Sequence, residues 1–594
     1  MPNLLSTITI SPMMPEARVA APLSTAEAAR LALEIYNLNA TARSLPGEYD
    51  DNFHLCASDS REFVLKVMHP AREESFVDMQ CSALTHLAQR ASHLALPRVV
   101  PTAKGEYFTR VATRDGATRL LWLLTFLPGA TLAEAKPQTL DLLESFGTLL
   151  AQIDTALLDF SHPATLRDLK WDLSRSLWAR DYLSHVGDPK RRVLVESFLD
   201  LYESEAVPLF SQLRRSVIYG DANDHNALVS PAWPQPRRVV SLIDFGDMHN
   251  GLTAAEPAIA AAYAVLGHEH PLPAAAAVLS AYHREFPLDE NEIAAFFPLV
   301  CARLAVSVIN SAHRQSLVPD DPYVTVTEGP AWQALERLAK IHPRLAHYTF
   351  RAACGFPALP QTVKFNKWLM QNNDSAANLI PINLREGNCV VLDLSVGSTF
   401  LGADPARFVE PIATREIDAS LNAAKVSVAV GRYNEPRPFY SSPLFSGSRN
   451  PTSESRTVHL GLDLFTRAGT PVSTPFDATV HAFADNRAVL DYGPVIILKH
   501  QTNDGLEFFT LYGHLSRESL SNLKIGDPLA RGESFAHIGA ASENGGWSPH
   551  LHFQIILDLL DRSTDFPGVA FPSQREIFTA VSPDPNLILG IPEK

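Results

Sequence analysis

Residues 217–226 read VIYGDANDHN, and residues 239–247 read VVSLIDFGD. Each apolar run predicts a short strand with polar side chains just past its end. Asp221 and Asn226 fall on the loop after the first strand, and Asp244 ends the second. If these strand ends lie side by side, the three groups point into one cleft. Phosphoryl transfer needs such a set: an acceptor for the substrate hydroxyl proton, and oxygen ligands that hold Mg²⁺ against phosphates.

Each of these residues has a predicted role. Asp221 is the base that orients the hydroxyl, and Asn226 and Asp244 hold the metal. Lys66, the lone cation in the apolar run FVLKVM, would grip the α- and β-phosphates of ATP. Taken singly, the loop motifs are more often turns, and a strand lysine is more often a snorkelling surface residue. The order and separation of all four residues favours the site.

The surrounding pattern predicts a strand-rich lobe followed by a helix-rich lobe. Alternating or apolar runs predict strands within 53–68 and at 106–112 and 119–127. Helical spacing of apolar residues fills about 140–215 and 254–350. We therefore expect a flexible tail at 1–22 and a nucleotide-binding domain at 23–355, with its small lobe at about 23–127 and its large lobe at about 128–355.

Further stretches carry a family likeness: LPGEYDDNFHL (45–55), FVLKVMHP (63–70), DMQCSALTHL (78–87), FSHPATLRDLKWDL (160–173), YGDANDHNALV (219–229) and LIDFGDM (242–248). Over about residues 24–350 the chain resembles the aminoglycoside phosphotransferase/choline kinase family, and its hydroxylysine-kinase-like members most. The resemblance implies a bilobal protein-kinase-like fold, ATP and Mg²⁺ as cofactors, and phosphorylation of a hydroxyl group on a small, amine-bearing molecule.

The resemblance also assigns nucleotide contacts. The loop carrying Gly47, Asn52 and Phe53 would cover the ATP phosphates, and Thr125 would begin the hinge near the adenine.

Two positions depart from the family pattern. Tyr219 stands where the family usually has His, which changes the support of the catalytic loop. Asp78 stands at the position of the Glu that pairs with the strand lysine, with Glu73 and Glu74 as rivals. Because Asp has the shorter reach, Lys66 would be less firmly held than in relatives.

Acidic and aromatic residues near the motifs bear on the substrate. Asp172 and Asp247 could face an ammonium group, with Trp171 as a cation–π surface. The alternative is that Trp171 belongs to the core and Asp172 caps a helix.

A second constellation lies near the end of the chain, where 458–465 read VHLGLDLF, 511–516 read LYGHLS and 549–556 read PHLHFQII. Two histidines and an acid form a catalytic zinc set that leaves one position for water. Alternation places His550 and His552 on one face of a strand. On a straight strand His459 and Asp463 would be about 13 Å apart, too far to share one ion, so we predict a bulge or bend at Gly461.

Each of these motifs alone is a weak signal, since a lone histidine is usually structural. Their combination and order closely resemble the lysostaphin/LytM-type zinc metalloendopeptidases over roughly 425–558. The resemblance implies that His459, Asp463 and His552 bind zinc. It assigns His514 and His550 as the catalytic pair that handles the water proton and steadies the tetrahedral intermediate. It also implies a peptide substrate, although SENGGWSPH before the last motif is less glycine-rich than usual.

Bulk properties limit the classes of partner. Lys+Arg 50 against Asp+Glu 65 gives a formal charge of −15, so we expect neither nucleic acid nor an anionic membrane as a partner. Five scattered cysteines and a start without a basic leader favour a reducing, cytoplasmic location. The expected fold class is multidomain α+β, with a β-rich connecting segment at 356–424, a mostly antiparallel β peptidase-type domain at 425–575 and a tail at 576–594.

The pairing of the two domains resembles the N-terminal part of long bacterial fusions that carry a class III aminotransferase. A functional link to a pyridoxal-phosphate aminotransferase or lyase is therefore expected, in a fragment or a naturally short version of such a fusion. Two alternatives remain open: a cell-wall metalloendopeptidase with a non-catalytic kinase-like domain, or a scaffold in which both sites are silent.

Overall fold

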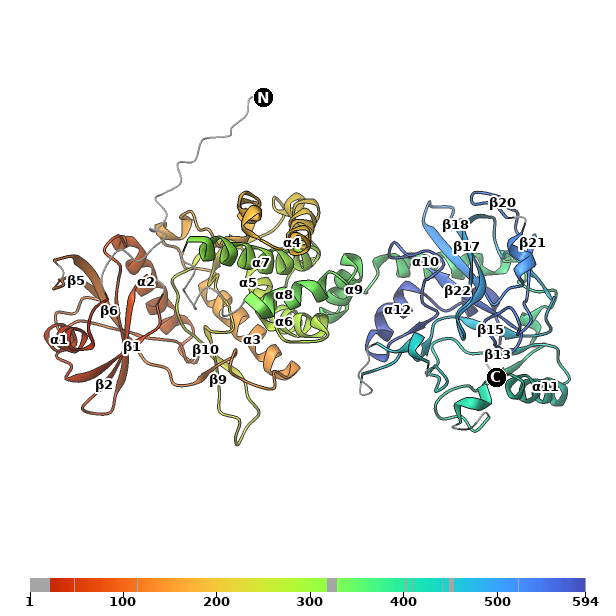
Figure 1. Cartoon of the computed structure of the whole chain (residues 1–594), viewed down its shortest axis with the longest axis horizontal. Helices are drawn as coiled ribbons and strands as arrows, with labels where there is room; N and C mark the ends of the chain where they lie inside the picture. Colours follow the sequence, from red (N-terminus) through yellow and green to blue (C-terminus); the bar gives the residue numbers. More distant parts are fainter. Residues whose placement is uncertain are drawn as a thin grey trace, which may run out of the picture. The chain divides into compact units, whose positions relative to one another are not determined.

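The computed structural model describes residues 22–592 except 48, 115, 318–327, 401, 403, 409, 441, 448–452 and 522. The chain divides into two compact units, Met1–Cys354 and Gly355–Lys594 (Figure 1), and each is described by itself. The tail expected at 1–22 lies almost wholly outside the described residues.

The first unit begins with helix α1 (Thr25–Tyr36), whose N-terminus is capped by the Ser24 side chain accepting from Glu27 N. Its apolar face packs on one face of a six-stranded sheet in a core that includes Leu31, Phe53 and Leu65. The sheet order is β1-β2-β3-β6-β4, with β5 also paired to β6. The strands are β1 (Ala40–Leu45), β2 (Asp51–Ala57), β3 (Glu62–Val67), β4 (Val99–Val100), β5 (Phe108–Ala112) and β6 (Thr118–Thr125), and helix α2 (Glu74–Arg90) follows β3.

The rest of the first unit is mainly helical, with two small sheets that carry the predicted loops. β8 (Arg215–Ile218) pairs with β11 (His249–Leu252), and β10 (Val239–Leu242) pairs with β9 (Ala227–Val229), which pairs with β7 (Ala130–Thr131). The helices are α3 (Leu140–Leu157), α4 (Pro189–Leu201), α5 (Ala255–Ala264), α6 (Pro271–Glu285), α7 (Glu290–Leu317), α8 (Glu328–Leu338) and α9 (Pro343–Ala353). Between α3 and α4 the predicted helical block contains 3-10 turns, at Pro163–Leu166 and Leu173–His185.

Helix α7 is the core helix of this unit. Among the residues that the structure describes it is the one helix long and apolar enough to cross a membrane, and 89% of its most apolar window is buried inside the protein. Apolar residues on all sides of a helix are expected where the helix is surrounded by protein.

The second unit is built on a mostly antiparallel eight-stranded sheet in the order β12-β13-β15-β22-β19-β18-β17-β20 (Figure 1). β14 (Val458–His459) pairs with β23 (Val569–Ala570), and β16 (Pro471–Ser473) pairs with β21 (Ser534–His537). The main strands are β12 (Val390–Leu392), β13 (Ala429–Gly431), β15 (Leu462–Phe465), β17 (Ala478–Asn486), β18 (Gly493–Gln501), β19 (Glu507–Gly513), β20 (Pro528–Leu529) and β22 (His550–Ile556).

Two expectations for this unit were wrong. The segment 356–424 is not β-rich, because its described residues form α10 (Pro360–Asn372), α11 (Ile412–Ala424) and only the short strand β12. Phe365 of α10 is buried against Phe508, so this helix belongs to the core of the unit. Residues 576–594 are not a tail, because α12 (Arg575–Val581) and α13 (Asn586–Leu589) bury apolar side chains such as Val581 and Ile588.

Candidate active sites

The structure brings the predicted catalytic loop of the first unit together around Asp221. One carboxylate oxygen, Oδ2, accepts from Asn226 Nδ2 at 2.8 Å and from Asn223 Nδ2 at 2.9 Å. The other, Oδ1, accepts from Nη2 of Arg303 at 3.0 Å. Three donors fix the orientation of this carboxylate, as expected for a group that must meet a substrate hydroxyl at one angle.

Asp244 lies beside this loop. The Ile243 N–H donates to the Asn226 carbonyl at 3.0 Å, which joins the two loops one residue before Asp244. Lys66 on β3 donates to Asp244 Oδ1 at 3.1 Å, and this cation lowers the pKa of Asp244. Lys66, Asp221, Asn226 and Asp244 therefore meet in one place, as the sequence predicted. Asn226 and Asp244 fit a Mg²⁺ site because both offer side-chain oxygens, the ligands that this ion prefers.

The backbone of Asp244 is in the left-handed region, with φ 62°. A non-glycine residue in this conformation is strained, and such strain persists where the surrounding structure holds it. Tyr219 supplies part of that support: its hydroxyl donates to the Ile243 carbonyl, and its ring packs edge-on against Phe245 with centroids 5.0 Å apart. Tyr219 thus ties the Asp221 loop to the segment that carries Asp244, just past β10.

The prediction that Asp78 pairs with Lys66 was wrong for this structure. Asp78 is about half exposed on α2, and its carboxylate pairs with His162 at 3.2 Å. The rival Glu74 pairs with Arg110 at 2.8 Å. The aspartate lacks one methylene of a glutamate, and Lys66 instead takes the carboxylate of Asp244.

The predicted phosphate-covering residues divide between two faces of the sheet. Asn52 lies opposite Lys66 in the β2–β3 register, and its Nδ2 donates to the Pro46 carbonyl at 3.2 Å. A Cβ on Gly47 would come within 2.4 Å of the Asp50 carbonyl oxygen, so this close turn requires glycine. Phe53 is a correction: its side chain is 1% exposed and lies in the core against α1, on the face away from Lys66.

Thr125 ends β6, as the hinge position requires. Its hydroxyl accepts from the Arg98 N–H at 2.9 Å, and its own N–H donates to the Arg98 carbonyl at 2.9 Å. These two hydrogen bonds attach the end of β6 to Arg98, the residue just before β4.

The electrostatics of the cleft are dominated by buried acids. Burial and the nearby Asp247 raise the pKa of Asp221 to about 8, although Arg303 opposes the shift. Burial likewise raises the pKa of Asp247. A cluster of carboxylates that repel one another is stabilised by nearby cations.

Asp172 and Trp171 have partners within the chain. The Asp172 carboxylate caps the turn that follows it by accepting from Ser174 N at 2.9 Å, and it lies 3.7 Å from His249 Nε2. The cation over the Trp171 ring is Arg303, 4.6 Å from the centroid. The capping alternative is therefore the correct one for Asp172.

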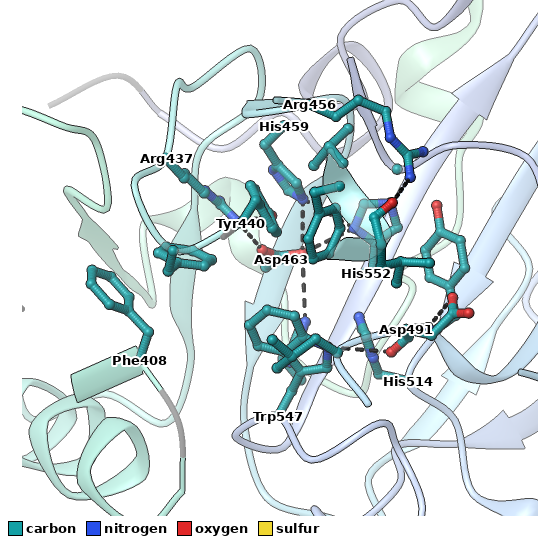
Figure 2. A pocket seen from close by; sticks show the side chains of 18 of the residues that line it. Phe408, Arg437, Tyr440, Arg456, His459, Asp463, Asp491, His514, Trp547 and His552 are labelled. Carbon is teal, nitrogen blue, oxygen red and sulfur yellow. Dashed lines mark hydrogen bonds and ion pairs between the residues drawn. The ribbon is translucent and has the colours of Figure 1, made fainter. Parts of the chain in front are cut away.

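In the second unit, three predicted ligands converge on one point (Figure 2). Nε2 of His459 and Nδ1 of His552 lie 3.0 Å apart, and each lies 3.2 Å from Asp463 Oδ1. All three side chains are buried. Two imidazole nitrogens and one carboxylate oxygen at this spacing fit zinc with a fourth position for water.

The strand is interrupted at the position where a bend was predicted, around Gly461. β14 ends at His459 and β15 begins at Leu462, and the two strands pair with different partners. A Cβ on Gly461 would lie 2.6 Å from the His552 ring, so glycine is needed for His552 to reach the cluster. Asp463 is directly opposite His552 in the β15–β22 register. The break and the register together produce the ligand set.

His514 and His550 form the predicted pair beside these ligands. Their ring centroids are 4.2 Å apart, and His550 Nε2 lies 3.7 Å from Asp463 Oδ1. The Nδ1 of His514 faces the Asn544 carbonyl at 2.9 Å, and that of His550 faces the Ser548 carbonyl at 2.7 Å. These carbonyls require a proton on Nδ1 and leave Nε2 as the free acceptor. Burial lowers the pKa of both rings, which favours the neutral form.

Outer contacts hold the ligands in place. His459 Nδ1 faces the Arg432 carbonyl at 2.9 Å, and His552 Nε2 faces Gln554 Oε1 at 3.0 Å. Burial alone would raise the pKa of Asp463, but His459 and Arg437 hold it well below its usual range. The carboxylate is therefore available as a ligand, and the outer contacts are the kind that orient metal-binding imidazoles.

Comparison with known proteins supports the same division. Residues 41–296 match the phosphotransferase enzyme family, and residues 457–562 match peptidase family M23. Hydroxylysine kinase of Danio rerio is 31% identical over 332 residues, which cover 53% of this chain and 91% of the relative. The chain belongs to the phosphotransferase enzyme family. Its second unit contains an M23 peptidase domain.

Two further comparisons concern one unit each. An uncharacterized metalloprotease of Haemophilus influenzae is 34% identical over 118 residues, which cover 20% of this chain and 22% of that protein. Among solved structures, amicoumacin kinase is similar with a TM-score of 0.41 and 13% identity, over 53% of this chain and 93% of that chain. The family matches confirm the predicted α+β class, with a kinase-like domain followed by a mostly antiparallel peptidase-type domain.

Sequence reasoning missed three residues of the two sites. Arg303 lies on α7, and the signal was available: it is the lone cation in the apolar run AAFFPLVCARLAVSVIN. Glu256 is fully buried on α5 and accepts from the Gly220 N–H at 2.8 Å, which holds the loop that carries Asp221. Arg437 contacts the carboxylate of Asp463 and had no comparable signal, because it lies in a loop rich in Pro and Asn.

Proposed function

We propose that the kinase unit transfers the terminal phosphoryl group of ATP to a hydroxyl of a small, amine-bearing metabolite, such as an amino alcohol or a hydroxy-amino acid. The convergence of Asp221, Asn226, Asp244 and Lys66 carries this proposal. The hydroxylysine kinases to which the unit is similar support the substrate class.

In this proposal each residue performs one task. Asp221 accepts the hydroxyl proton, and the donors on its two oxygens aim it at the acceptor. Asn226 and Asp244 would hold Mg²⁺, which would neutralise phosphate charge. Lys66 binds the phosphates beside Asp244. Little else is needed, since phosphoryl transfer depends mainly on positioning and electrostatic stabilisation.

Asp247 is the acid proposed to face the substrate amine. Among the described residues its carboxylate has no hydrogen-bond partner, and it lies close enough to Asp221 to affect the pKa of that group. An ammonium group placed between the cleft acids would relieve their mutual repulsion.

The test is a substrate panel with the full chain. Hydroxylysine, ethanolamine and further amino alcohols are incubated with ATP and Mg²⁺, and release of ADP is compared between the wild type and Asp221→Asn. We expect turnover of at least one amine, and a loss of about 100-fold or more in the variant. The amine-bearing substrate class fails if none of these amines is phosphorylated.

We further propose that the M23 unit is a zinc hydrolase. The convergence of the ligand atoms of His459, Asp463 and His552 on one point carries this proposal. The match to peptidase family M23 supports it. Bound zinc would supply a Lewis acid and an activated water. The lowered pKa of His514 and of His550 favours neutral rings, and their Nδ1 atoms face carbonyls. The Nε2 atoms would therefore accept a proton and later return it.

Zinc content tests this second proposal. The purified full chain should bind one zinc ion per chain, and His459→Ala and His552→Ala should remove it while phosphorylation by the kinase unit is unchanged. Retention of stoichiometric zinc in both variants would place the ion elsewhere.

A further inference from the structure

The zinc-ligand cluster of the M23 unit lies in the wall of a cavity of about 440 Å³. This volume is in the range of sites for small molecules. The same cavity is lined by the proposed catalytic pair, so whatever fills it lies against the reacting bond.

Aromatic rings form the wall around this cluster. Phe408 packs on Phe439 with centroids 4.2 Å apart, Phe439 on Tyr440 at 4.8 Å, and Tyr440 on Phe445 at 4.9 Å. Trp547 completes the wall, 6.0 Å from Phe439 and 6.2 Å from His514. Figure 2 shows Phe408, Tyr440 and Trp547 around the same cavity as His459 and Asp463.

These rings belong to a buried hydrophobic cluster of the unit, and each also borders the cavity. Phe408, Phe439, Tyr440, Phe445 and Trp547 each retain 6–8% exposure, and each lines the cavity. They therefore present apolar faces to whatever enters, in a geometry that stacks well on a flat ring or chain.

Most of this wall comes from outside the segment shared with peptidase family M23. That match spans residues 457–562, whereas the four rings from Phe408 to Phe445 precede it. The shared segment supplies the zinc ligands and Trp547, and the preceding chain adds the aromatic side. The aromatic side of the site thus comes mostly from residues outside the matched segment.

The charged side chains of the lining balance one another. Arg437 is neutralised by Asp463 and Glu435, at 2.6 and 2.9 Å. Arg456 and Asp491, of opposite charge, lie near enough for each to shift the pKa of the other. Both arginines also lie over rings of the wall, Arg437 over Phe439 at 5.7 Å and Arg456 over Phe445 at 5.8 Å. Because these cations already have carboxylates beside them, the wall favours an apolar group over a second charged one.

We infer that the zinc site acts on a compact amide that carries an aromatic or similarly flat apolar group, and that this group occupies the cavity beside the scissile bond. The inference rests on the proposed zinc hydrolase function. In the reaction the water oxygen bonds to the carbonyl carbon, the C–N bond breaks, and the water proton is delivered to the leaving amine. Long glycine-rich peptides are not the preferred substrate, because glycine has no side chain to fill the aromatic wall.

Two hydroxamates that share one zinc-binding group test the inference. The full chain is loaded with Co²⁺ in place of zinc, and its visible spectrum is titrated with acetohydroxamate and with phenylacetohydroxamate. The phenyl compound should bind about tenfold or more tightly than the methyl compound, because its ring is buried against the wall. Phe439→Leu and Phe439→Ala should reduce this ratio toward one and leave acetohydroxamate affinity nearly unchanged.

The controls separate the two proposals. Phe509→Ala removes an aromatic side chain of the same unit that packs on His481 and does not line the cavity, and it should keep the wild-type ratio. If acetohydroxamate leaves the Co²⁺ spectrum unchanged, the zinc site itself is wrong and both proposals fall. If both hydroxamates bind equally in the wild type, or if Phe439→Ala keeps the full ratio, the aromatic substrate class is wrong while the zinc site stands.

Discussion

Arg437 donates to Asp463 Oδ2 at 2.6 Å, on the carboxylate oxygen that does not face His459 and His552. The Nε of Arg437 donates to Glu435 at 2.9 Å, and all three side chains are almost fully buried. The guanidinium therefore occupies one side of the ligand carboxylate and leaves Oδ1 for the ion. Glu435 compensates the added positive charge, so the cluster keeps the single net negative charge of one aspartate.

Replacing this arginine should destabilise the M23 unit and make it depend on metal. Arg437→Met leaves two carboxylates buried without a cation, which we expect to lower the free energy of unfolding by about 3–5 kcal/mol. Because zinc restores positive charge at Asp463, it should raise the melting temperature of the variant more than that of the wild type. Calorimetry of the full chain with and without Zn²⁺ measures both effects. Arg415→Met, at a side chain that is 73% exposed, is the control. Equal zinc-induced shifts in wild type and Arg437→Met would contradict this account.

The observed partner of Lys66 leads to a prediction about the kinase unit. Lys66→Ala should lower kcat/KM for ATP by roughly 100-fold, since it removes a cation from the phosphate site. Asp78→Ala should change it by less than about threefold, since this half-exposed carboxylate pairs with His162. Steady-state kinetics with varied ATP measure both. If Asp78→Ala is as damaging as Lys66→Ala, then Asp78 takes over the lysine when nucleotide binds.

Gly461 should be required for zinc binding. In Gly461→Ala the new methyl group would lie 2.6 Å from the His552 ring and 2.7 Å from the Phe553 carbonyl, so a ligand must move. We expect zinc affinity to fall by about 10–100-fold, the range seen when contacts that orient a ligand are lost. Competition with a chromogenic chelator measures it. Gly397→Ala, where the nearest atom is 3.9 Å away, should bind zinc as the wild type does. Equal zinc affinity in the two variants would show that His552 is free to shift.

The meeting of distant motifs was predictable because strand patterns determine where polar residues lie. Asp221 and Asp244 each follow an apolar run, β8 and β10, and the two strand ends meet although the strands belong to different sheets. In the same way, alternation along 549–556 placed His550 and His552, and the distance argument at Gly461 predicted the break in the strand. These inferences need only the alternation of side chains along a strand and the rise per residue of a strand.

Other features depend on tertiary distances that no local pattern encodes. Whether Lys66 pairs with Asp78 or with Asp244 depends on how close each carboxylate lies to the lysine in the folded protein. The short side chain of Asp78 was the one sign in the sequence that its pairing with Lys66 would be weak. Arg303 reaches Asp221 from a helix 82 residues later. The helices α10 and α11 were not predicted, because their segment was grouped with the strand-rich sequence that follows it.

The final prediction concerns the stability of the kinase unit as a function of pH. Burial raises the pKa of Glu256 to about 7, from an ordinary value of 4.5, although the Gly220 N–H opposes the shift. The folded protein therefore keeps a proton on Glu256 between about pH 4.5 and 7, where the unfolded chain has released it. Stability from this group is present below pH 4.5 and is lost as the pH rises through about 7.

Glu256→Gln should remove that dependence, because the amide oxygen still accepts from Gly220 N and has no proton to lose. Calorimetry of the full chain at pH 5 and pH 7.5 measures it, with the kinase transition identified by its shift on adding ATP and Mg²⁺. The wild-type transition should lose more of its stability between these pH values than that of the Gln variant. Glu256→Ala, which also removes the acceptor for Gly220, should lower stability at both pH values and reduce kcat. If the wild type and Glu256→Gln respond equally to pH, Glu256 is ionised in the folded protein and another group must hold the proton.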